Sequence, residues 1–520
     1  MKRETMMARL REREAPWDII VIGGGATGAG IAVDAASRGY SVLLLEREDF
    51  GKGTSSRSTK LIHGGVRYLQ QGNLPLVMEA LKERGILRQN APHLVHDLAF
   101  LVPDYLWWEK PYYGIGLKLY DLLAGRCGFG PSKILSRGQT IERAPALTRD
   151  GLRGSVLYHD GQFDDARLLI TLMLTAADLG AVVLNYASVV DLAKDQNGIV
   201  NGVVFLDRET GTQFQCKSRV VINATGIFSD EIRRLTNPAA SNLVTPSQGI
   251  HLVFDQSFLP GETAIMVPHT PDGRLLFAIP WHEHTLVGTT DTPIDSPSYE
   301  PRPLEEEIRF ILDTVARYLS KPPKRADVLS AFAGIRPLVK TAHSNSHKTS
   351  GISRSHAIEV DASRLITIAG GKWTTYRHMA EDAVNRAITV GKLEKRPCTT
   401  ATLRFHGYQS GGTKAWEVYG TDAEQIRRIA EDAPGLARLL DPELPYIGAE
   451  VIWAAREEMA RTLDDVLARR FRALPLNARA AHRMAPMVAE LLAHELGKDQ
   501  AWAQTQLQSF REIADQYILA

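Results

Sequence analysis

A glycine-rich turn near the N-terminus has the residue types and spacing that bind a pyrophosphate. The run Gly23-Gly24-Gly25-Ala26-Thr27-Gly28 fits the pattern G-x-G-x-x-G. Glycine allows the tight turn and lets backbone N–H groups approach a phosphate, and the N-terminus of the following helix adds positive potential. Glu46 follows about 20 residues later, where a carboxylate accepts hydrogen bonds from ribose hydroxyls. These residues predict a dinucleotide site; the alternative is an ordinary glycine-rich turn beside a solvated glutamate.

A polar stretch after this unit bears on which dinucleotide is bound. Residues 54–68 combine hydroxyl groups, cations and glycines without a helix or strand period. A bound phosphate and a flavin ring would use all three kinds of group. NAD and FAD share the glycine pattern, so the distinction between them rests on this stretch. On composition alone an ordinary polar loop, with His63 exposed or hydrogen-bonded in place, is the better interpretation.

Four motifs, taken in chain order, resemble a known family. They are TSSRSTKLIHGGVRYL from Thr54, NATG from Asn223, GIRPL from Gly334 and GGKWTTYR from Gly370. With them the sequence closely resembles the FAD-dependent glycerol-3-phosphate dehydrogenase family, which belongs to the D-amino-acid-oxidase-like flavoproteins. The resemblance implies FAD as cofactor, glycerol 3-phosphate as donor and dihydroxyacetone phosphate as product. It also implies ubiquinone or menaquinone as acceptor at a membrane surface.

The FAD site that the resemblance implies consists mainly of small and hydroxyl-bearing residues. Its members are Gly23, Gly25, Ala26, Thr27, Gly28, Glu46, Thr54, Ser55, Ser56, Ala224, Gly226, Gly371, Trp373 and Thr374. Ala224 and Gly226 match a second small-residue turn, which permits close approach of the cofactor. Trp373 and Thr374 begin a helix whose N-terminus could face the flavin N1 and C2 carbonyl, where negative charge accumulates on reduction.

The resemblance also implies a set of histidines and cations that act on the substrate. Catalytic roles fall to His251, Arg336 and His63, and substrate-binding roles to Arg67, Tyr68 and Lys372. A secondary alcohol gives up hydride as its hydroxyl proton leaves, so the site needs a base and a cation for the developing alkoxide. Either histidine could be the base, and the cation that holds the phosphate stays open between Arg67 and Lys372. Without the resemblance, Arg336 would be interpreted as a surface ion pair and His251 as a hydrogen-bonded strand residue.

The elements around these motifs follow a strand, helix, strand order. Apolar runs at residues 17–22 and 42–45 flank a segment with apolar residues at helical spacing, which predicts a parallel βαβ unit. A second unit starts at a helix cap formed by Asp164-Asp165 and passes into a strand at residues 182–184. Asn201-Gly202 and Thr210-Gly211 predict the turns of a meander that leads to a strand at residues 220–223.

Changes in pattern along the chain predict an α/β (α+β) protein with three domains. These are a Rossmann-like FAD-binding domain, a β-sheet substrate domain and an α-helical C-terminal domain. Residues 1–16 are expected to form an N-terminal arm, 17–240 and 350–395 the discontinuous FAD-binding domain, 241–349 the substrate-binding sheet domain and 396–520 the helical domain. Apolar alternation at residues 250–254, 275–279 and 285–287 supports the sheet, and helix-forming residues at 449–472 and 478–496 support the helices.

Bulk composition excludes several classes of protein. The 520 residues are 44% hydrophobic and 23% charged, and 61 basic against 60 acidic residues leave a formal charge of +1. So small a charge provides no long-range field for nucleic acid. Cys127, Cys216 and Cys398 lie far apart, so neither a disulfide framework nor a thiolate metal site is expected. The sequence also lacks a D-x-[DN]-x-[DN]-G calcium loop, and we expect no metal.

The sequence predicts a protein that lies on a membrane without crossing it. It has no run of about 18 apolar residues and no N-terminal secretory signal. Transfer to a quinone in lipid requires contact with the bilayer, and the aromatic stretch at residues 106–123 is the candidate because Trp and Tyr favour the interface. A buried helix pair is the alternative. We therefore expect a peripheral, monotopic protein at the cytoplasmic face of the inner (cytoplasmic) membrane, and a homodimer stays open.

Two other functions fit part of the pattern. One is a related flavoprotein that oxidises an amino acid or a 2-hydroxy acid, and the other is a flavin-binding sensor without catalysis. A sensor has no reason to keep His251, Arg336 and Lys372 at one site. The oxidases of the family carry an insertion that this sequence does not show, which favours a dehydrogenase.

Overall fold

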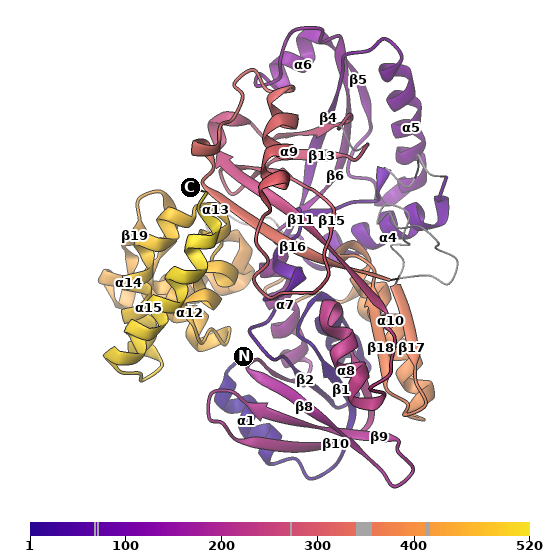
Figure 1. Cartoon of the computed structure of the whole chain (residues 1–520), viewed down its shortest axis with the longest axis vertical. Coiled ribbons are helices and arrows are strands. Elements are labelled where there is room, and N and C mark those ends of the chain that lie inside the picture. The colour runs from indigo at the N-terminus through magenta and orange to yellow at the C-terminus, as the bar shows by residue number, and fades with distance from the viewer. Residues whose placement is uncertain (67–68, 70–71, 271–272, 340–355, 411–415, 520) are drawn as a thin grey trace.

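The structure is built around two β-sheets, one above the other in Figure 1, and a group of C-terminal helices lies beside their junction. The computed structural model describes residues 1–66, 69, 72–270, 273–339, 356–410 and 416–519. Among these residues no helix has both the length and the apolar character needed to pass through a bilayer. The fold class is the predicted one: a nucleotide-binding sheet, a second sheet and a helical domain.

The first sheet confirms the predicted parallel core. Its strand order is β17 (His356–Val360), β18 (Ile366–Gly370), β10 (Gln213–Asn223), β1 (Trp17–Ile22), β2 (Val42–Leu45) and β7 (Val182–Leu184). The strands from β18 to β7 run parallel, and β17 is antiparallel at the edge. A meander of β8 (Ala187–Lys194) and β9 (Val200–Asp207) joins β10. The limits of β1, β2 and β7 are those predicted from the sequence.

One predicted turn of this meander lies inside a strand. Asn201-Gly202 belongs to β9, and the turn before that strand is at Asn197-Gly198. A Cβ at Gly202 would overlap the carbonyl oxygen of Cys216 on the neighbouring strand. This glycine therefore permits close strand approach, a role that the dipeptide alone does not distinguish from a turn.

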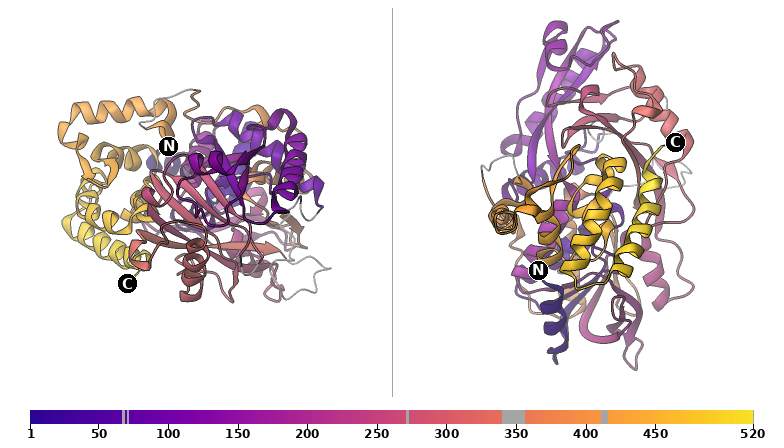
Figure 2. Two further views of the ribbon diagram at one scale, coloured as in Figure 1. Left: turned by 90° about the horizontal axis from the view of Figure 1, so that it is seen from above. Right: turned by 90° about the vertical axis from the view of Figure 1, so that its left-hand side faces the viewer.

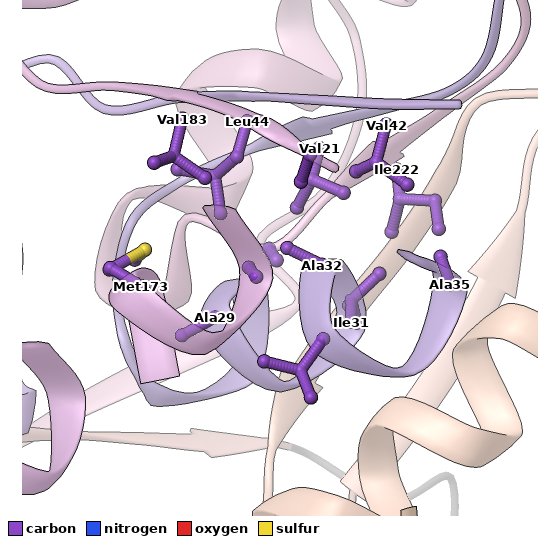
Figure 3. Packing of buried hydrophobic residues seen from close by; sticks show 14 of the residues in the cluster. Val21, Ala29, Ile31, Ala32, Ala35, Val42, Leu44, Met173, Val183 and Ile222 are labelled. Carbon is purple, nitrogen blue, oxygen red and sulfur yellow. The ribbon is translucent and has the colours of Figure 1, made fainter. Parts of the chain in front are cut away.

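Alanine-rich packing brings a helix close to the parallel strands. Figure 3 shows Ala32 and Ala35 beneath Val21, Val42 and Ile222 of the strands, and all five side chains are fully buried. Because alanine adds little volume, the helix approaches the sheet closely and its N-terminus lies at the glycine-rich turn. The helices that pack together here are α2 (Ala26–Ser37), α7 (Asp165–Asp178) and α10 (Tyr376–Val390).

The second sheet is antiparallel except where β12 meets β4. Its order is β15 (Thr292–Pro293), β11 (Val244–Asp255), β14 (His284–Gly288), β13 (Leu276–Trp281), β12 (Thr263–Val267), β4 (Val95–Asp104), β6 (Gly154–Phe163) and β3 (Leu61–Ile62); β16 (Ser330–Val339) pairs with β11, and β5 (Lys133–Ser136) with β6. The strands β3 to β6 fall within residues 17–240, which were expected to belong to the FAD-binding domain. That boundary is corrected, because these strands pair with the second sheet; the boundary at 350 lies outside the described residues.

Both ends of the chain are packed against the body. The expected N-terminal arm contains helix α1 (Arg3–Arg11), whose residues Met6, Met7 and Leu10 are buried and which contacts β7. Arg3 donates to Asp207 at 2.6 Å, so a charged segment that resembles a free arm is in fact anchored. The C-terminal part confirms the helical prediction and is seen from its side in Figure 2. It contains α11 (Ala423–Asp432), β19 (Leu439–Asp441), β20 (Leu444–Ile447), α12 (Gly448–Glu457), α13 (Ala473–Leu476), α14 (Ala478–Glu495) and α15 (Gln500–Ala514).

Candidate active site

Two cavities with a shared wall lie where the two sheets meet. Each has a volume of about 290 Å³. Both are lined by Thr54, Pro337, Gly370, Gly371, Lys372 and Trp373. The first cavity lies at the carboxyl ends of β1, β2 and β10, which is where open α/β sheets bind ligands. The two cavities therefore form one elongated site.

The first cavity gathers most of the predicted cofactor residues. Its lining includes Gly23, Gly25, Ala26, Thr27, Glu46, Thr54, Ser55, Ala224, Gly226, Gly371 and Trp373. Gly28 and Ser56 lie behind this lining. A Cβ at Gly28 would overlap the Gly23 carbonyl oxygen, so this glycine serves the packing of turn against helix. The Ser56 side chain is buried, and its carbonyl accepts a hydrogen bond from Lys60 Nζ at 2.8 Å.

Glycine is required where the two small-residue turns meet. Gly23 has a φ of +110°, and a Cβ there would lie 2.7 Å from the carbonyl oxygen of Ala224. Any larger residue would be strained in this conformation and would fill the space beside the cavity. The hydroxyl of Ser55 accepts a hydrogen bond from the Ala26 N–H at 2.9 Å, at the first residue of α2. This arrangement is a cradle of the kind that holds a pyrophosphate at a helix N-terminus.

The carboxylate of Glu46 is held in place at the end of β2. Its two oxygens accept hydrogen bonds from the N–H groups of Gly24 at 2.6 Å and Glu48 at 2.8 Å. Burial raises the pKa of Glu46, and these two hydrogen bonds oppose the rise. A carboxylate oxygen accepts more than one hydrogen bond, so Glu46 can also receive a ribose hydroxyl at the cavity wall. The geometry fits the predicted role.

Aromatic residues that the sequence did not single out complete this cavity. The rings of Phe228 and Tyr299 stack with centroids 4.3 Å apart. The guanidinium of Arg47 lies 5.1 Å and 4.8 Å from the two ring centroids. All three residues line the cavity. Their position on separate segments explains why no local pattern marks them.

The second cavity brings together the predicted catalytic residues. His63, His251, Arg336, Lys372 and Thr374 line it. Arg67 and Tyr68, the other predicted substrate residues, lie outside the residues that the structure describes. The predicted histidines and cations that the structure describes therefore line one cavity. This cavity shares a wall with the first cavity.

Strand register explains how a histidine and an arginine far apart in sequence meet. In the pairing of β11 with β16, Gly249 lies opposite Gly334 and His251 opposite Phe332. Alternate positions face the same side of a sheet, so His251 shares its side with Arg336. A Cβ at Gly249 would lie too close to the Arg336 guanidinium, and one at Gly288 would overlap the His251 ring. The two glycines leave the space that these side chains occupy.

The guanidinium of Arg336 is fixed by backbone and hydroxyl acceptors. Its Nη2 donates to the carbonyl of Thr290 at 2.9 Å and to Thr289 Oγ1 at 3.2 Å, and its Nη1 donates to the Gln248 carbonyl at 3.3 Å. Asp291 Oδ1 lies 3.5 Å from Nη1. Arg336 is therefore a cation that these acceptors hold in the cavity wall. The alternative interpretation, a surface ion pair, does not fit this setting.

His251 is buried in a setting that keeps its ring neutral. The side chain is 2% exposed, and its ring stacks on Phe332 at 5.1 Å with an interplanar angle of 20°. Burial, followed by the charges of Lys60 and Arg336, lowers the pKa of His251 well below its ordinary value. A neutral imidazole can accept a proton. The Nε2 atom lies 2.9 Å from Thr59 Oγ1, a contact that the sequence did not indicate.

The GGKWTTYR motif joins the two cavities. Trp373 Nε1 donates to the carbonyl of Ser55 at 2.8 Å, and Thr374 Oγ1 accepts from the His63 N–H at 3.3 Å. Residues 373–375 form a 3₁₀ turn that continues into α10, as predicted. Hydrogen bonds thus connect the segment to both halves of the 54–68 stretch, so the predicted motifs form one structural unit.

Several lining residues of the second cavity escaped the sequence analysis. Arg274 donates to the Asp291 carbonyl at 2.7 Å and adds a further cation. The other side of the cavity is apolar, with Phe100 and Tyr158 stacked at 5.1 Å. The run Gly288-Thr289-Thr290-Asp291 at the end of β14, with a glycine and hydroxyls after a strand, was the available signal. Within the described ranges, no three His, Cys, Asp or Glu side chains lie together as metal ligands.

Known proteins resemble this chain along nearly its whole length. A family model described as "FAD dependent oxidoreductase" matches residues 18–377, and one described as "C-terminal domain of alpha-glycerophosphate oxidase" matches residues 366–503. The mitochondrial glycerol-3-phosphate dehydrogenase of Homo sapiens is 42% identical over 547 residues, covering 98% of this chain and 75% of that protein. The corresponding protein of Arabidopsis thaliana is 41% identical over 552 residues, covering 96% of this chain and 86% of its own.

A solved structure extends the similarity to three dimensions. The glycerol-3-phosphate dehydrogenase from Bacillus halodurans, complexed with FAD, superposes with a TM-score of 0.81 at 31% identity. The match covers 99% of this chain and 97% of that chain. Both sheets and the helical C-terminal part therefore have counterparts in that protein.

Proposed function

The chain belongs to the FAD-dependent glycerol-3-phosphate dehydrogenase family, and from this premise we propose that it oxidises sn-glycerol 3-phosphate to dihydroxyacetone phosphate and delivers the electrons to a membrane quinone. The observation that carries the proposal is one cavity in which a buried neutral histidine and a positioned guanidinium lie beside a dinucleotide cradle. An alcohol that bears a phosphate needs a base, an oxyanion donor and further cations. The second cavity contains all three.

The residues of the first cavity fit FAD. The Gly23–Gly28 turn and the N-terminus of α2 would hold the pyrophosphate, and Glu46 would accept the ribose hydroxyls. Residues 370–373 line both cavities, so the other end of such a molecule would lie next to His251 and Arg336. FAD bound here supplies the hydride acceptor.

In the second cavity we assign to His251 the role of the base that accepts the substrate hydroxyl proton. Its Nδ1 is buried and has no hydrogen-bond partner among the described residues, so Nε2 is the nitrogen that a hydroxyl can reach. Nε2 accepts the substrate hydroxyl proton, and Arg336 stabilises the developing alkoxide. Lys372 and Arg274 line the same cavity and would hold the phosphate, together with Arg67. His63 is the alternative base.

Anaerobic mixing of the yellow holoenzyme with candidate donors tests this function directly. Glycerol 3-phosphate should bleach the flavin absorbance, and glycerol, lactate and NADH should leave it unchanged. The cations explain the difference from glycerol and lactate, because neither of those donors carries a phosphate. Bleaching by lactate or an amino acid, without bleaching by glycerol 3-phosphate, would instead support the related oxidase function.

Glu46 offers a test of where FAD binds. Glu46→Ala should weaken FAD binding about 10- to 100-fold, because a hydrogen bond to a charged group is worth about 1.5–3 kcal/mol. The dissociation constant can be measured by titrating the apoprotein with FAD. Glu48→Ala is the matched control: it removes a carboxylate that pairs with Arg208 outside the cavity, and it keeps the backbone N–H that contacts Glu46. Parent-like affinity in Glu46→Ala would contradict the ribose assignment.

The membrane contact that we propose is the outer face of helix α5 (Glu109–Ala124) with the two tryptophans before it. This helix lies at the edge of the molecule away from the C-terminal helices (Figure 1). Trp107 is 76% exposed, Ile115 75% and Leu122 78%, whereas the opposite face of α5 is buried at Leu117 and Tyr120. The helix is thus both a core helix and an exposed apolar surface. Because one face of the helix is buried and the other is exposed, both interpretations from the sequence, a buried helix and a membrane contact, describe part of it.

A lipid surface is the occupant that this face fits. Exposed apolar patches of this kind mark interaction sites, and Trp and Tyr rings favour the bilayer interface. Lys118 on the same helix is well exposed and can meet anionic headgroups. A quinone dissolves in lipid, so an enzyme that reduces it must touch the bilayer. These observations favour a peripheral membrane protein.

Removing the two tryptophans tests this placement. Trp107→Ser with Trp108→Ser should weaken binding to lipid vesicles at least about tenfold, because the exposed parts of the two rings would leave water at a gain of about 25 cal/mol/Å². Vesicle sedimentation measures the binding, and reduction of a soluble dye should stay at the parent rate. Leu439→Ser with Met487→Ser, exposed apolar residues of the C-terminal helical domain, is the matched control. Equal loss of vesicle binding and dye reduction would point to a core role instead.

A further inference from the structure

Residues 49–60, here called the cofactor loop, lie between the cavities and the C-terminal helical domain. Gly51 to Ser55 line the first cavity, and Thr54, Arg57, Ser58 and Thr59 line the second. The loop therefore contacts both ends of the site. Its opposite side contacts charged residues of the C-terminal domain. These residues have no role in the proposed reaction.

The start of the loop is anchored by two arginines of a π-helix. Arg469 Nε donates to Asp49 Oδ2 at 2.6 Å, and Arg470 donates to both Asp49 oxygens at 2.5 Å and 2.9 Å. All three side chains are almost completely buried. The arginines lie at the end of the π-helix η11 (Asp465–Arg470). π-Helices are rare and are frequently found at functional sites.

The middle of the loop has two further contacts with the same domain. Lys52 Nζ lies 3.1 Å from Asp464 Oδ2. Arg57 Nη1 donates to the Tyr517 hydroxyl at 2.8 Å, near the C-terminus. Lys52 and Arg57 also line the cavities. Each residue thus connects a cavity wall to the C-terminal domain.

The end of the loop is anchored through a carboxylate at the start of α7. Arg472 Nη2 donates to the Ser56 carbonyl at 2.8 Å and to Asp165 Oδ1 at 3.0 Å. Asp165 Oδ2 in turn accepts hydrogen bonds from Ser58 N–H at 2.9 Å and Lys60 Nζ at 2.7 Å. Arg472 therefore fixes both the loop and the helix against which it packs.

Buried ion pairs of this kind determine geometry more reliably than they add stability. Taking two charges out of water offsets much of their attraction, but removing one partner leaves a buried charge and is strongly unfavourable. The loop can consequently occupy few positions while the arginines are in place. We propose that the C-terminal helical domain serves to hold the cofactor loop against FAD, with Arg469, Arg470 and Arg472 as positioning residues. The inference rests on the proposed placement of FAD in the first cavity.

The test uses the holoenzyme and two substitutions on the C-terminal side of the contact. Arg472→Gln removes the anchor at Ser56. Asp464→Asn removes the nearer of the two carboxylates that pair with Lys52, the other being Glu300, and it also removes a carboxylate that pairs with Arg469; neither Arg472 nor Asp464 lines a cavity. The matched control is Arg483→Gln, which breaks ion pairs to Asp441 and Glu443 within the C-terminal domain. After dilution, the rise of flavin fluorescence measures FAD release. We expect release at least about tenfold faster in both variants and unchanged in the control.

A second measurement separates a positioning role from a merely structural one. Melting temperatures are compared without FAD and with excess FAD, because a ligand stabilises the fold in proportion to the logarithm of its affinity. A loosened loop should reduce the gain in melting temperature from FAD. Parent-like release, with melting lowered equally in both conditions, would overturn the proposal. If Arg472→Gln fails to fold, Asp464→Asn decides by the same criteria.

Failure of this inference can be distinguished from failure of the FAD placement. If Glu46→Ala binds FAD as tightly as the parent, the placement is wrong. If Glu46→Ala weakens binding while Arg472→Gln and Asp464→Asn release FAD like the parent, only the role of the C-terminal domain is wrong. Faster release in Arg483→Gln, equal to that in the two variants, would also overturn the inference, because any loosening of the domain would then suffice.

Discussion

His251→Ala should slow the reduction of the bound flavin by glycerol 3-phosphate about 10²- to 10⁴-fold, the usual contribution of a general base. The ring is buried, its pKa is held well below the ordinary value, and its Nε2 lies 2.9 Å from the Thr59 hydroxyl. Single-turnover mixing without oxygen measures this step. FAD content should stay at the parent level, since His251 lines only the second cavity.

A comparison with His63 decides which histidine is the base. His63→Ala is measured in the same way, and the larger loss in rate identifies the base. His482, a partly exposed residue near Asp515 in the C-terminal domain, is the matched control, and His482→Ala should leave the rate unchanged. A parent-like rate for His251→Ala beside a large loss for His63→Ala would transfer the role to His63.

The dependence of the rate on pH follows from the lowered pKa of His251. Burial and the charges of Lys60 and Arg336 disfavour protonation, so the ring stays neutral as the pH falls through the ordinary histidine value of about 6.5. The base is lost only at lower pH, once the ring takes up a proton. The reduction rate should therefore stay flat as the pH falls through about 6.5 and decline only at lower pH. A rate that halves near pH 6.5 would indicate a solvated histidine as the base.

Local patterns predicted the nucleotide-binding unit, because the information that determines it is local. The apolar runs, the glycine turn and the Asp164 cap lie within short segments, and Asp164 accepts hydrogen bonds from the N–H groups of Ala166 and Arg167 as a cap should. The limits of the FAD-binding domain failed for the opposite reason. Residues 95–104, which form β4, are apolar enough for either sheet, and only the pairing of β4 with β12, far along the chain, decides which sheet it joins.

The residues of the site also fall into two groups, those that local spacing predicts and those that it does not. The glycines and Glu46 follow from spacing, because the chemistry of a pyrophosphate turn dictates that spacing. His251 and Arg336 came from the resemblance alone, since a single histidine or arginine in a strand also fits a structural role. Strand register brings them together, and Gly249 and Gly288 leave the space that their side chains occupy. Thr59 and Arg274 escaped because nothing within their own segments reveals what they contact.

Arg336→Lys should retain FAD but reduce the flavin at least about tenfold more slowly, at the mild end of the 10²- to 10³-fold loss that follows removal of an oxyanion donor. Lysine keeps one positive charge but lacks the planar guanidinium with several donors. In the parent, those donors bind the carbonyls of Gln248 and Thr290 and the Thr289 hydroxyl, which fixes the cation in direction as well as position. An ammonium cannot reproduce that orientation.

Substrate dependence separates the roles that Arg336 could have. If it stabilises the alkoxide, saturating glycerol 3-phosphate leaves the slow rate of Arg336→Lys in place, because the lost interaction forms only in the transition state. If it only binds the phosphate, saturating substrate restores the rate and the apparent affinity alone falls. Arg325→Lys, which alters an exposed ion pair with Glu305, is the matched control and should match the parent in both. A parent-like rate and affinity in Arg336→Lys would remove Arg336 from the site, and the proposed mechanism would then lack its oxyanion donor.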